Sequence, residues 1–236
     1  IQAGNLLAFD IDEERKLVLL NYSSTAHNLL HEIDGGWSPE LRLMRGLVYK
    51  YGAAGHLEGV KLASRGFEKF FNRNELPETS VENLSSDAAD QLLLCTRKED
   101  GHMIEYFMHD DKLCSTTRGR LDSLSGNAAL SMLSRGSFIK ASCAGKLAGF
   151  DLMTLVCEFV HPDTEVHVDY AGAKKIFLLE AYDKEGNAAT RDVLQRIRLS
   201  TDGVLSAVDV RWMTFSRLLD EINDRSVENC EGWVAQ

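Results

Sequence analysis

Short apolar segments recur along the whole chain of 236 residues, and turn-forming residues separate them. Many of these segments are rich in strand formers or alternate between apolar and polar positions, which is the period of a β-strand. Asp100-Gly101 and Asp110-Asp111 lie between consecutive segments and predict hairpin-type turns. The expected strands are residues 16–22, 41–49, 58–64, 92–96, 102–108, 112–117, 152–160, 165–170 and 175–182.

Apolar residues at helical spacing predict two helices, over residues 192–199 and 213–222. Residues 121–135 and 137–147 have mixed periodicity and modest helix propensity. Many antiparallel strands with a few helices outside them make an α+β fold. The sequence contains no internal repeat and no long Gly/Pro/Ser linker, so we expect one continuous domain over residues 1–236.

Composition narrows the class of protein. The chain is 44% hydrophobic and 26% charged, which argues against disorder. No apolar run approaches the roughly 20 residues of a membrane helix, so no membrane partner is expected. The formal net charge is −10, which argues against binding nucleic acid through bulk positive charge. Because the sequence starts at Ile1 without methionine and stops directly after an apolar residue, we interpret both ends as cuts in a longer chain.

The five cysteines are odd in number and widely spaced, and no CxxC pair occurs among them. Neither a disulfide framework nor a zinc site is therefore indicated. A reducing, intracellular and hence cytoplasmic location is the plain interpretation.

A candidate nucleophile lies in Thr96-Arg97-Lys98-Glu99-Asp100-Gly101, between two expected strands. A lysine nucleophile must lose its proton, which requires burial, nearby cations or a metal ion. The glycine lets the backbone turn sharply beside a ligand. Lys-x-Asp-Gly is short, however, and on these residues alone a solvated lysine before a turn is the favoured interpretation.

Four further segments change this interpretation when they are taken in order. Each places a charged residue in an apolar or aromatic setting, where it needs an ionic or hydrogen-bonding partner. They are Leu43-Met44-Arg45-Gly46-Leu47-Val48-Tyr49, Ala63-Ser64-Arg65-Gly66-Phe67-Glu68-Lys69-Phe70-Phe71-Asn72, Cys157-Glu158-Phe159-Val160-His161-Pro162 and Cys230-Glu231-Gly232-Trp233-Val234.

The ordered set resembles the covalent nucleotidyltransferases, and within them the RNA ligase 1 family of T-even-type phages. The resemblance runs from about Asn21 to Gln236, and the Phe-Glu-Lys-Phe-Phe-Asn segment separates it from DNA ligases and capping enzymes. It implies an α+β nucleotidyltransferase (ATP-grasp-like) domain, with antiparallel sheets, flanking helices and a nucleotide pocket between sheets.

The resemblance also implies roles. Lys98 matches the nucleophile that attacks ATP and forms a lysyl–AMP intermediate. Asp100 and Glu231 match residues that position the lysine or an Mg²⁺ or Mn²⁺ ion. AMP then passes to an RNA 5′-phosphate, and a 3′-hydroxyl displaces it. The implied partner is RNA with single-stranded or broken stem-loop ends, as in tRNA repair, and the protein is expected to be a monomer.

Nucleotide-binding roles fall on further positions. Arg45 and Lys69 match residues that contact the nucleotide, and Phe71 is a candidate for the adenosine pocket. Glu158 matches the carboxylate that binds the ribose. Tyr22 resembles a tyrosine at the pocket edge, although its spacing to Arg45 is longer than expected.

Two departures from the family keep alternatives open. Arg118 stands before a glycine where the family usually has lysine, so it either binds the phosphate or ribose of the nucleotide or marks a relaxed role. The family's final pair of lysines after Glu231 is missing, because the sequence stops at Gln236. The helical C-terminal domain of some relatives is also missing from this sequence. Another covalent nucleotidyltransferase, or a nucleotide- or RNA-binding module without catalysis, therefore stays possible at this point.

Overall fold

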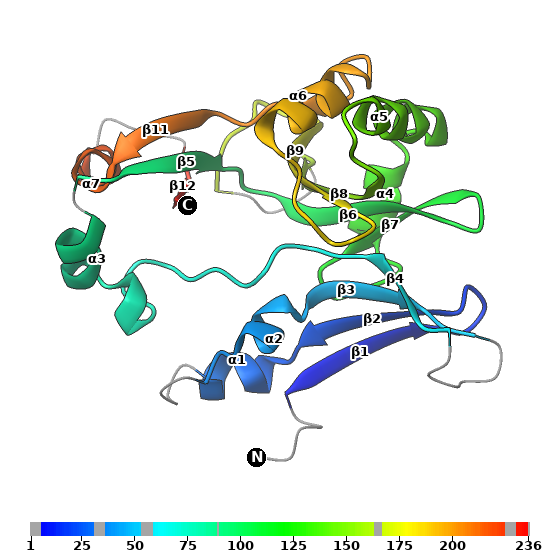
Figure 1. The fold of residues 1–236 in the computed structure, drawn as a ribbon, viewed down its shortest axis with the longest axis horizontal. Helices are drawn as coiled ribbons and strands as arrows, with labels where there is room; N and C mark the ends of the chain where they lie inside the picture. The colour runs from blue at the N-terminus through cyan, green and yellow to red at the C-terminus, as the bar shows by residue number, and fades with distance from the viewer. Residues whose placement is uncertain are drawn as a thin grey trace. The chain divides into compact units, whose positions relative to one another are not determined.

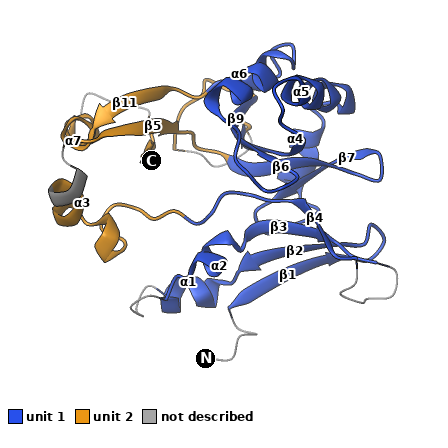
Figure 2. Cartoon of the chain, in the orientation of Figure 1, with its two compact units in different colours: residues 1–69, 102–159, 175–207 blue, residues 70–101, 160–174, 208–236 orange. Residues whose placement is uncertain are grey.

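Three sheets contain the strands of the computed structural model (Figure 1). The structure describes residues 6–30, 36–52, 59–88, 90–162, 167–224 and 230–235. The chain divides into two units that interleave in sequence (Figure 2). Unit 1 comprises residues 1–69, 102–159 and 175–207, and unit 2 comprises residues 70–101, 160–174 and 208–236.

Unit 1 begins with a four-stranded antiparallel sheet of order β1-β2-β3-β4. Alternate residues of β2 are buried, which is why this segment forms a strand with one face on the core. Two short helices, α1 and α2, precede β3 in the chain. The bounds are β1 Leu7–Asp12, β2 Leu17–Tyr22, α1 Ser24–Leu30, α2 Pro39–Leu43, β3 Arg45–Lys50 and β4 Lys61–Ser64.

The second sheet of unit 1 has five strands in the order β10-β9-β8-β6-β7. Helices α4, α5 and α6 each begin at a Ser or Thr whose side chain accepts a backbone N–H of the first turn. The bounds are β6 His102–His109, β7 Lys112–Thr117, α4 Leu124–Leu130, α5 Arg135–Leu147, β8 Leu152–Val160, β9 Lys175–Asp183, α6 Arg191–Leu199 and β10 Leu205–Ser206.

The five-stranded sheet is covered on both faces. Ile104 and Tyr106 of β6 belong to a core cluster with residues of α5 and α6, whose helices lie beside this sheet in Figure 1. Phe107 packs instead with Leu19 and Val48 of the first sheet. Because side chains alternate along a strand, odd-numbered residues of β6 face the first sheet. Glu158 pairs with Met103 across β8 and β6 and therefore lies on the same face.

Unit 2 contains the three-stranded antiparallel sheet β11-β5-β12. Cys95 of β5 packs with Met213, Phe215 and Leu218 in a small core, to which α3 and α7 also contribute. The bounds are η2 Pro77–Thr79, α3 Val81–Ala88, β5 Leu92–Lys98, β11 Val210–Thr214, α7 Phe215–Asn223 and β12 Gly232–Ala235.

The structure confirms the α+β class, and it corrects three expected elements. Residues 41–43 are helical rather than extended, because Ser38 caps α2 and Pro39 occupies its first turn. Met213 and Thr214 belong to β11, and the expected helix starts only at Phe215. Residues 167–170 form no strand, while residues 58 and 165–166 lie outside the described residues. Every helix within the described ranges falls short of a membrane-spanning length and hydropathy.

Candidate functional site

Lys98 is the last residue of β5, and it lies opposite Gly232 at the start of β12. This pairing brings Glu231, the residue before Gly232, beside Lys98, and Lys98 Nζ forms an ion pair with Glu231 Oε1. The Lys98 side chain is 36% exposed and that of Glu231 is 31% exposed. The amine is thus held by a carboxylate and remains accessible to a ligand.

The turn after Lys98 is fixed by a loop from residues 167–170. The backbone N–H groups of His167 and Val168 both donate to Asp100 Oδ2, the latter at 3.0 Å. The Asp100 N–H donates to the Tyr170 hydroxyl at 2.8 Å, and that hydroxyl donates to Glu99 Oε2 at 2.8 Å. Burial raises the pKa of Tyr170 well above its usual value, so the hydroxyl keeps its proton.

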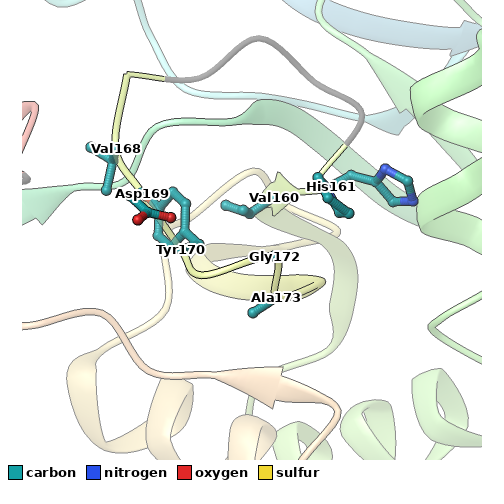
Figure 3. Close-up of a pocket in the computed structure, with 8 residues that line it drawn as sticks. Val160, His161, Val168, Asp169, Tyr170, Gly172 and Ala173 are labelled. Carbon is teal, nitrogen blue, oxygen red and sulfur yellow. The ribbon is translucent and has the colours of Figure 1, made fainter.

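A small pocket of unit 2 is bounded in part by the same loop (Figure 3). Its volume is about 140 Å³, which is below the range of pockets that enclose a drug-sized ligand, roughly 300–1,000 Å³. It is lined by Val160, His161, Pro162, Val168, Asp169, Tyr170, Gly172 and Ala173. By itself it cannot hold a nucleotide.

In unit 1, cations gather on two aromatic rings. Lys69 is only 8% exposed, and its Nζ lies 5.1 Å from the ring centroid of Trp37 and 6.0 Å from that of Tyr22. Arg118 lies 5.5 Å above the Tyr22 ring and donates to the Tyr22 hydroxyl at 3.3 Å. Tyr22 and Trp37 meet edge to face at 5.2 Å. We name these four residues the aromatic–cation cluster.

Arg45 joins this cluster to the second sheet. Its guanidinium is largely buried, and burial lowers its pKa, while the nearby Tyr22 and Glu158 act to raise it and Arg118 lowers it further. Its Nη1 lies 3.6 Å from Met103 Sδ. Arg45 is thus electrostatically linked to Tyr22, Arg118 and Glu158, three of the predicted nucleotide-binding residues.

Glu105, which the sequence analysis did not single out, is fully buried in β6. Ser64 Oγ donates to its Oε2 at 2.6 Å. Burial raises the pKa of Glu105 to about 8, although Ser64, Arg45 and Arg65 each lower it. Glu105 Oε1 lies against Gly46 and Gly66, where a β-carbon would come inside van der Waals contact. Since both glycines follow a motif arginine, this carboxyl group sets the backbone beside Arg45 and Arg65.

The predicted site residues therefore fall into two groups. Unit 1 holds Tyr22, Arg45, Lys69, Arg118 and Glu158, and unit 2 holds Lys98, Asp100, Glu231 and the half-buried Phe71. Sequence reasoning missed Trp37, Glu105 and Tyr170. Among the residues that the structure describes, no three His, Cys, Asp or Glu side chains gather as a metal-binding group.

Comparison with known proteins assigns the family. A family model described as RNA ligase, of the phage RNA ligase 1 type, matches residues 43–235, which is most of the chain. The chain belongs to this RNA ligase family. The match includes the segments around Arg45, Lys69, Lys98, Glu158 and Glu231.

Solved RNA ligases have a similar fold. Two forms of an archaeal ATP-dependent RNA ligase match 99% of this chain, with TM-scores of 0.61 and 0.59 at 16% and 15% identity. The match covers 56% and 55% of those chains. A lysine mutant of the Naegleria gruberi RNA ligase with ATP and Mn matches 66% of this chain and 49% of its own length, at 16% identity and a TM-score of 0.46. This RNA ligase family chain thus spans about half the length of the solved proteins that it matches.

Proposed function

We propose that the protein is an ATP-dependent RNA ligase that joins a 3′-hydroxyl to a 5′-phosphate through a lysyl–AMP intermediate on Lys98. The observation that carries this proposal is the Lys98–Glu231 pair at the end of β5, in a chain of the RNA ligase family. Residues 1–236 constitute its adenylyltransferase domain.

In the first step the deprotonated Lys98 Nζ attacks the α-phosphorus of ATP. A nitrogen–phosphorus bond forms, the bond to the bridging oxygen breaks, and pyrophosphate leaves with that electron pair. Glu231 touches the amine and is placed to orient it. Asp100 fixes the following turn through two backbone N–H groups. Positioning and charge neutralisation supply most of the catalysis in such a transfer.

In the second and third steps the AMP group moves from Lys98 to the RNA 5′-phosphate, and the 3′-hydroxyl then displaces AMP. Each step exchanges one phosphorus–ligand bond for another, so no oxidant or further nucleotide is needed. A covalent intermediate stores the energy of ATP for the final phosphodiester bond.

The residues of unit 1 have the chemistry that nucleotide binding requires. Arg45, Lys69 and Arg118 supply positive charge for phosphate oxygens. Tyr22 and Trp37 of this unit present aromatic rings, and in unit 2 Phe71 is a candidate for the adenosine pocket. Glu158 is a carboxylate acceptor for the ribose hydroxyls.

Mg²⁺ or Mn²⁺ enters with the triphosphate in this proposal. Mg²⁺ typically binds through one or two carboxylates together with substrate phosphates and water, so a dedicated protein cage is not required. Glu231 and Asp100 are the carboxylates of unit 2 that fit this role, and the bound ion would neutralise phosphate charge.

The RNA partner is proposed to carry single-stranded or broken stem-loop ends, with cleaved tRNA loops as one such substrate. The protein is proposed to act as a monomer in a reducing, intracellular location. All five cysteines are free thiols, as that location requires.

Strand joining tests the proposed function. The full-length protein is incubated with ATP, Mg²⁺ and matched RNA or DNA strands that carry a 5′-phosphate and a 3′-hydroxyl. We expect joining of the RNA ends, and its loss in Lys98→Ala. Joining of the DNA strands alone would assign the protein to another nucleotidyltransferase activity. If the folded protein joins neither RNA nor DNA, a binding module without catalysis is favoured.

A further inference from the structure

Tyr170 occupies an unusual place beside the candidate nucleophile. Its hydroxyl makes two hydrogen bonds: it accepts from the Asp100 N–H and donates to Glu99 Oε2, both at 2.8 Å. The two partners directly follow Lys98 in the chain. One phenol thus holds the backbone and a side chain of the turn that begins at Lys98.

The same loop holds this turn from a second direction. The N–H groups of His167 and Val168 donate to Asp100 Oδ2, so residues 99 and 100 have four hydrogen bonds to residues 167–170. Glu99 is only 8% exposed, so water cannot easily replace a lost partner of its carboxylate. Among these bonds, only those of Tyr170 depend on a side chain of the loop.

We propose that Tyr170 is a positioning residue for Lys98: it fixes the Glu99–Gly101 turn so that the Lys98 amine is aimed at the α-phosphate. This inference rests on the proposed function and adds a residue outside the motifs that the sequence analysis used. Misplacing a reacting group by about 1 Å can cost on the order of 100-fold in rate. The phenol acts through the backbone and does not touch the reacting atoms.

A direct chemical role for Tyr170 does not fit the geometry. Both hydrogen-bonding functions of its hydroxyl are already satisfied within the turn. Its effect must therefore pass through the position of residues 99 and 100.

The test is Tyr170→Phe, which removes the hydroxyl and keeps the ring. The matched control is Tyr106→Phe, which deletes the hydroxyl of a buried tyrosine that donates to Ala129 O in the core of unit 1. Single-turnover formation of the labelled enzyme–AMP adduct is followed across ATP concentrations with the full-length protein. This measurement yields a rate constant, an ATP concentration for half-maximal rate and a final labelled fraction.

We expect Tyr170→Phe to lower the rate constant about 10- to 100-fold, while the half-maximal ATP concentration and the labelled fraction stay unchanged. Tyr106→Phe should keep the wild-type rate constant. A purely structural role would lower the labelled fraction instead, and that outcome overturns the inference. A wild-type rate constant in Tyr170→Phe also overturns it.

Variants of Glu99 test the inference even where Tyr170→Phe folds poorly, and a double-mutant cycle adds to this test where Tyr170→Phe folds. Glu99→Ala removes the acceptor of the tyrosine hydroxyl, and Glu99→Gln keeps an oxygen that can accept the same bond. We expect Glu99→Gln to retain more of the rate than Glu99→Ala, and the combined loss in Glu99→Ala/Tyr170→Phe to be less than additive. Equal rates in Glu99→Gln and Glu99→Ala, or full additivity, contradict the inference. If the wild-type protein itself takes no label, the proposed function fails instead.

Discussion

Glu105 shows how one side chain can fix the backbone of two segments that are distant in the sequence. Its carboxyl group lies between the sheets of unit 1, bonded to Ser64 and packed against Gly46 and Gly66. Gly46 adopts a φ of +85°, which non-glycine residues rarely tolerate. The carboxyl group occupies the space that larger side chains would need, so both positions require glycine.

The pH dependence of stability tests the burial of Glu105. Its pKa rises from 4.5 to about 8 on folding, so the folded state holds a proton that the unfolded state releases above pH 4.5. The stability that this proton provides is complete below pH 4.5 and is lost as the pH rises toward 8. Glu105→Gln stays neutral and lacks this loss, so its stability relative to wild type should increase between pH 5 and 8, by on the order of a few kcal/mol.

Urea unfolding of both proteins at several pH values measures this difference. A constant difference between Glu105→Gln and wild type over that pH range would show that Glu105 does not titrate as its burial demands. Glu105→Gln removes the titration without removing the hydrogen bond, because the amide oxygen can still accept from Ser64.

Lys69 offers a test of the aromatic–cation cluster. Lys69→Met keeps a long apolar side chain over Trp37 and Tyr22 but removes the charge. If Lys69 binds the nucleotide as proposed, the ATP concentration for half-maximal adenylylation should rise by about tenfold or more, the value of one charged hydrogen bond. Lys140→Met is the control, because Lys140 is exposed and pairs with Asp202 in unit 1. An equal effect in both variants would remove Lys69 from the proposed site.

At the scale of elements, the approach of β3 to the segment after β4 depends on Gly66. A β-carbon there would lie 2.6 Å from the Arg45 carbonyl oxygen and 2.7 Å from Glu105 Oε1. Gly66→Ala should therefore destabilise the protein by about 1–3 kcal/mol. Gly136→Ala in α5 is the control, since its nearest neighbour would be Ser134 Oγ at 3.6 Å. Thermal unfolding compares the two variants, and equal stability would contradict the packing described here.

Local patterns predicted many of the elements, but β1, α1, α3, β10, β11 and β12 were not among them. The strands β6, β7, β8 and β9 follow from alternation and apolar runs, and the structure confirms them. Ser38 and Pro39 carried a readable helix start that the apolar run over residues 41–49 obscured. Tyr170 was expected in a strand, but its backbone is irregular, and its hydroxyl binds a turn some 70 residues earlier in the chain.

The candidate site also contains residues that the sequence indicates and residues that only the fold brings there. Motif order pointed to Lys98, Glu231 and the cations of unit 1, because these residues lie inside recognisable segments. Trp37 belongs to no such segment, and only the fold brings it to Lys69. Glu105 lies in a strand in which a polar residue is expected at alternate positions. No local feature of the sequence therefore indicates that its carboxyl group is buried.

At the scale of the whole molecule, charge limits how the chain can meet RNA. A net charge of −10 opposes phosphate binding except where Arg45, Lys69, Lys98 and Arg118 raise the local potential. The 236-residue chain should therefore bind single-stranded RNA weakly, at a Kd no tighter than about 10⁻⁶ M at physiological salt. Fluorescence anisotropy with labelled RNA measures this affinity, and sub-micromolar binding with a steep salt dependence would contradict it.

The central claim is that Lys98 becomes covalently joined to AMP. Full-length protein is incubated with ATP labelled at the α-phosphate and with Mg²⁺ or Mn²⁺, then denatured and separated by electrophoresis. We predict label that survives denaturation, is released by added pyrophosphate and disappears in Lys98→Ala, while Lys140→Ala keeps it. Folded wild-type protein that takes no label, or a Lys98→Ala variant that keeps it, would contradict the assignment of Lys98 as the nucleophile.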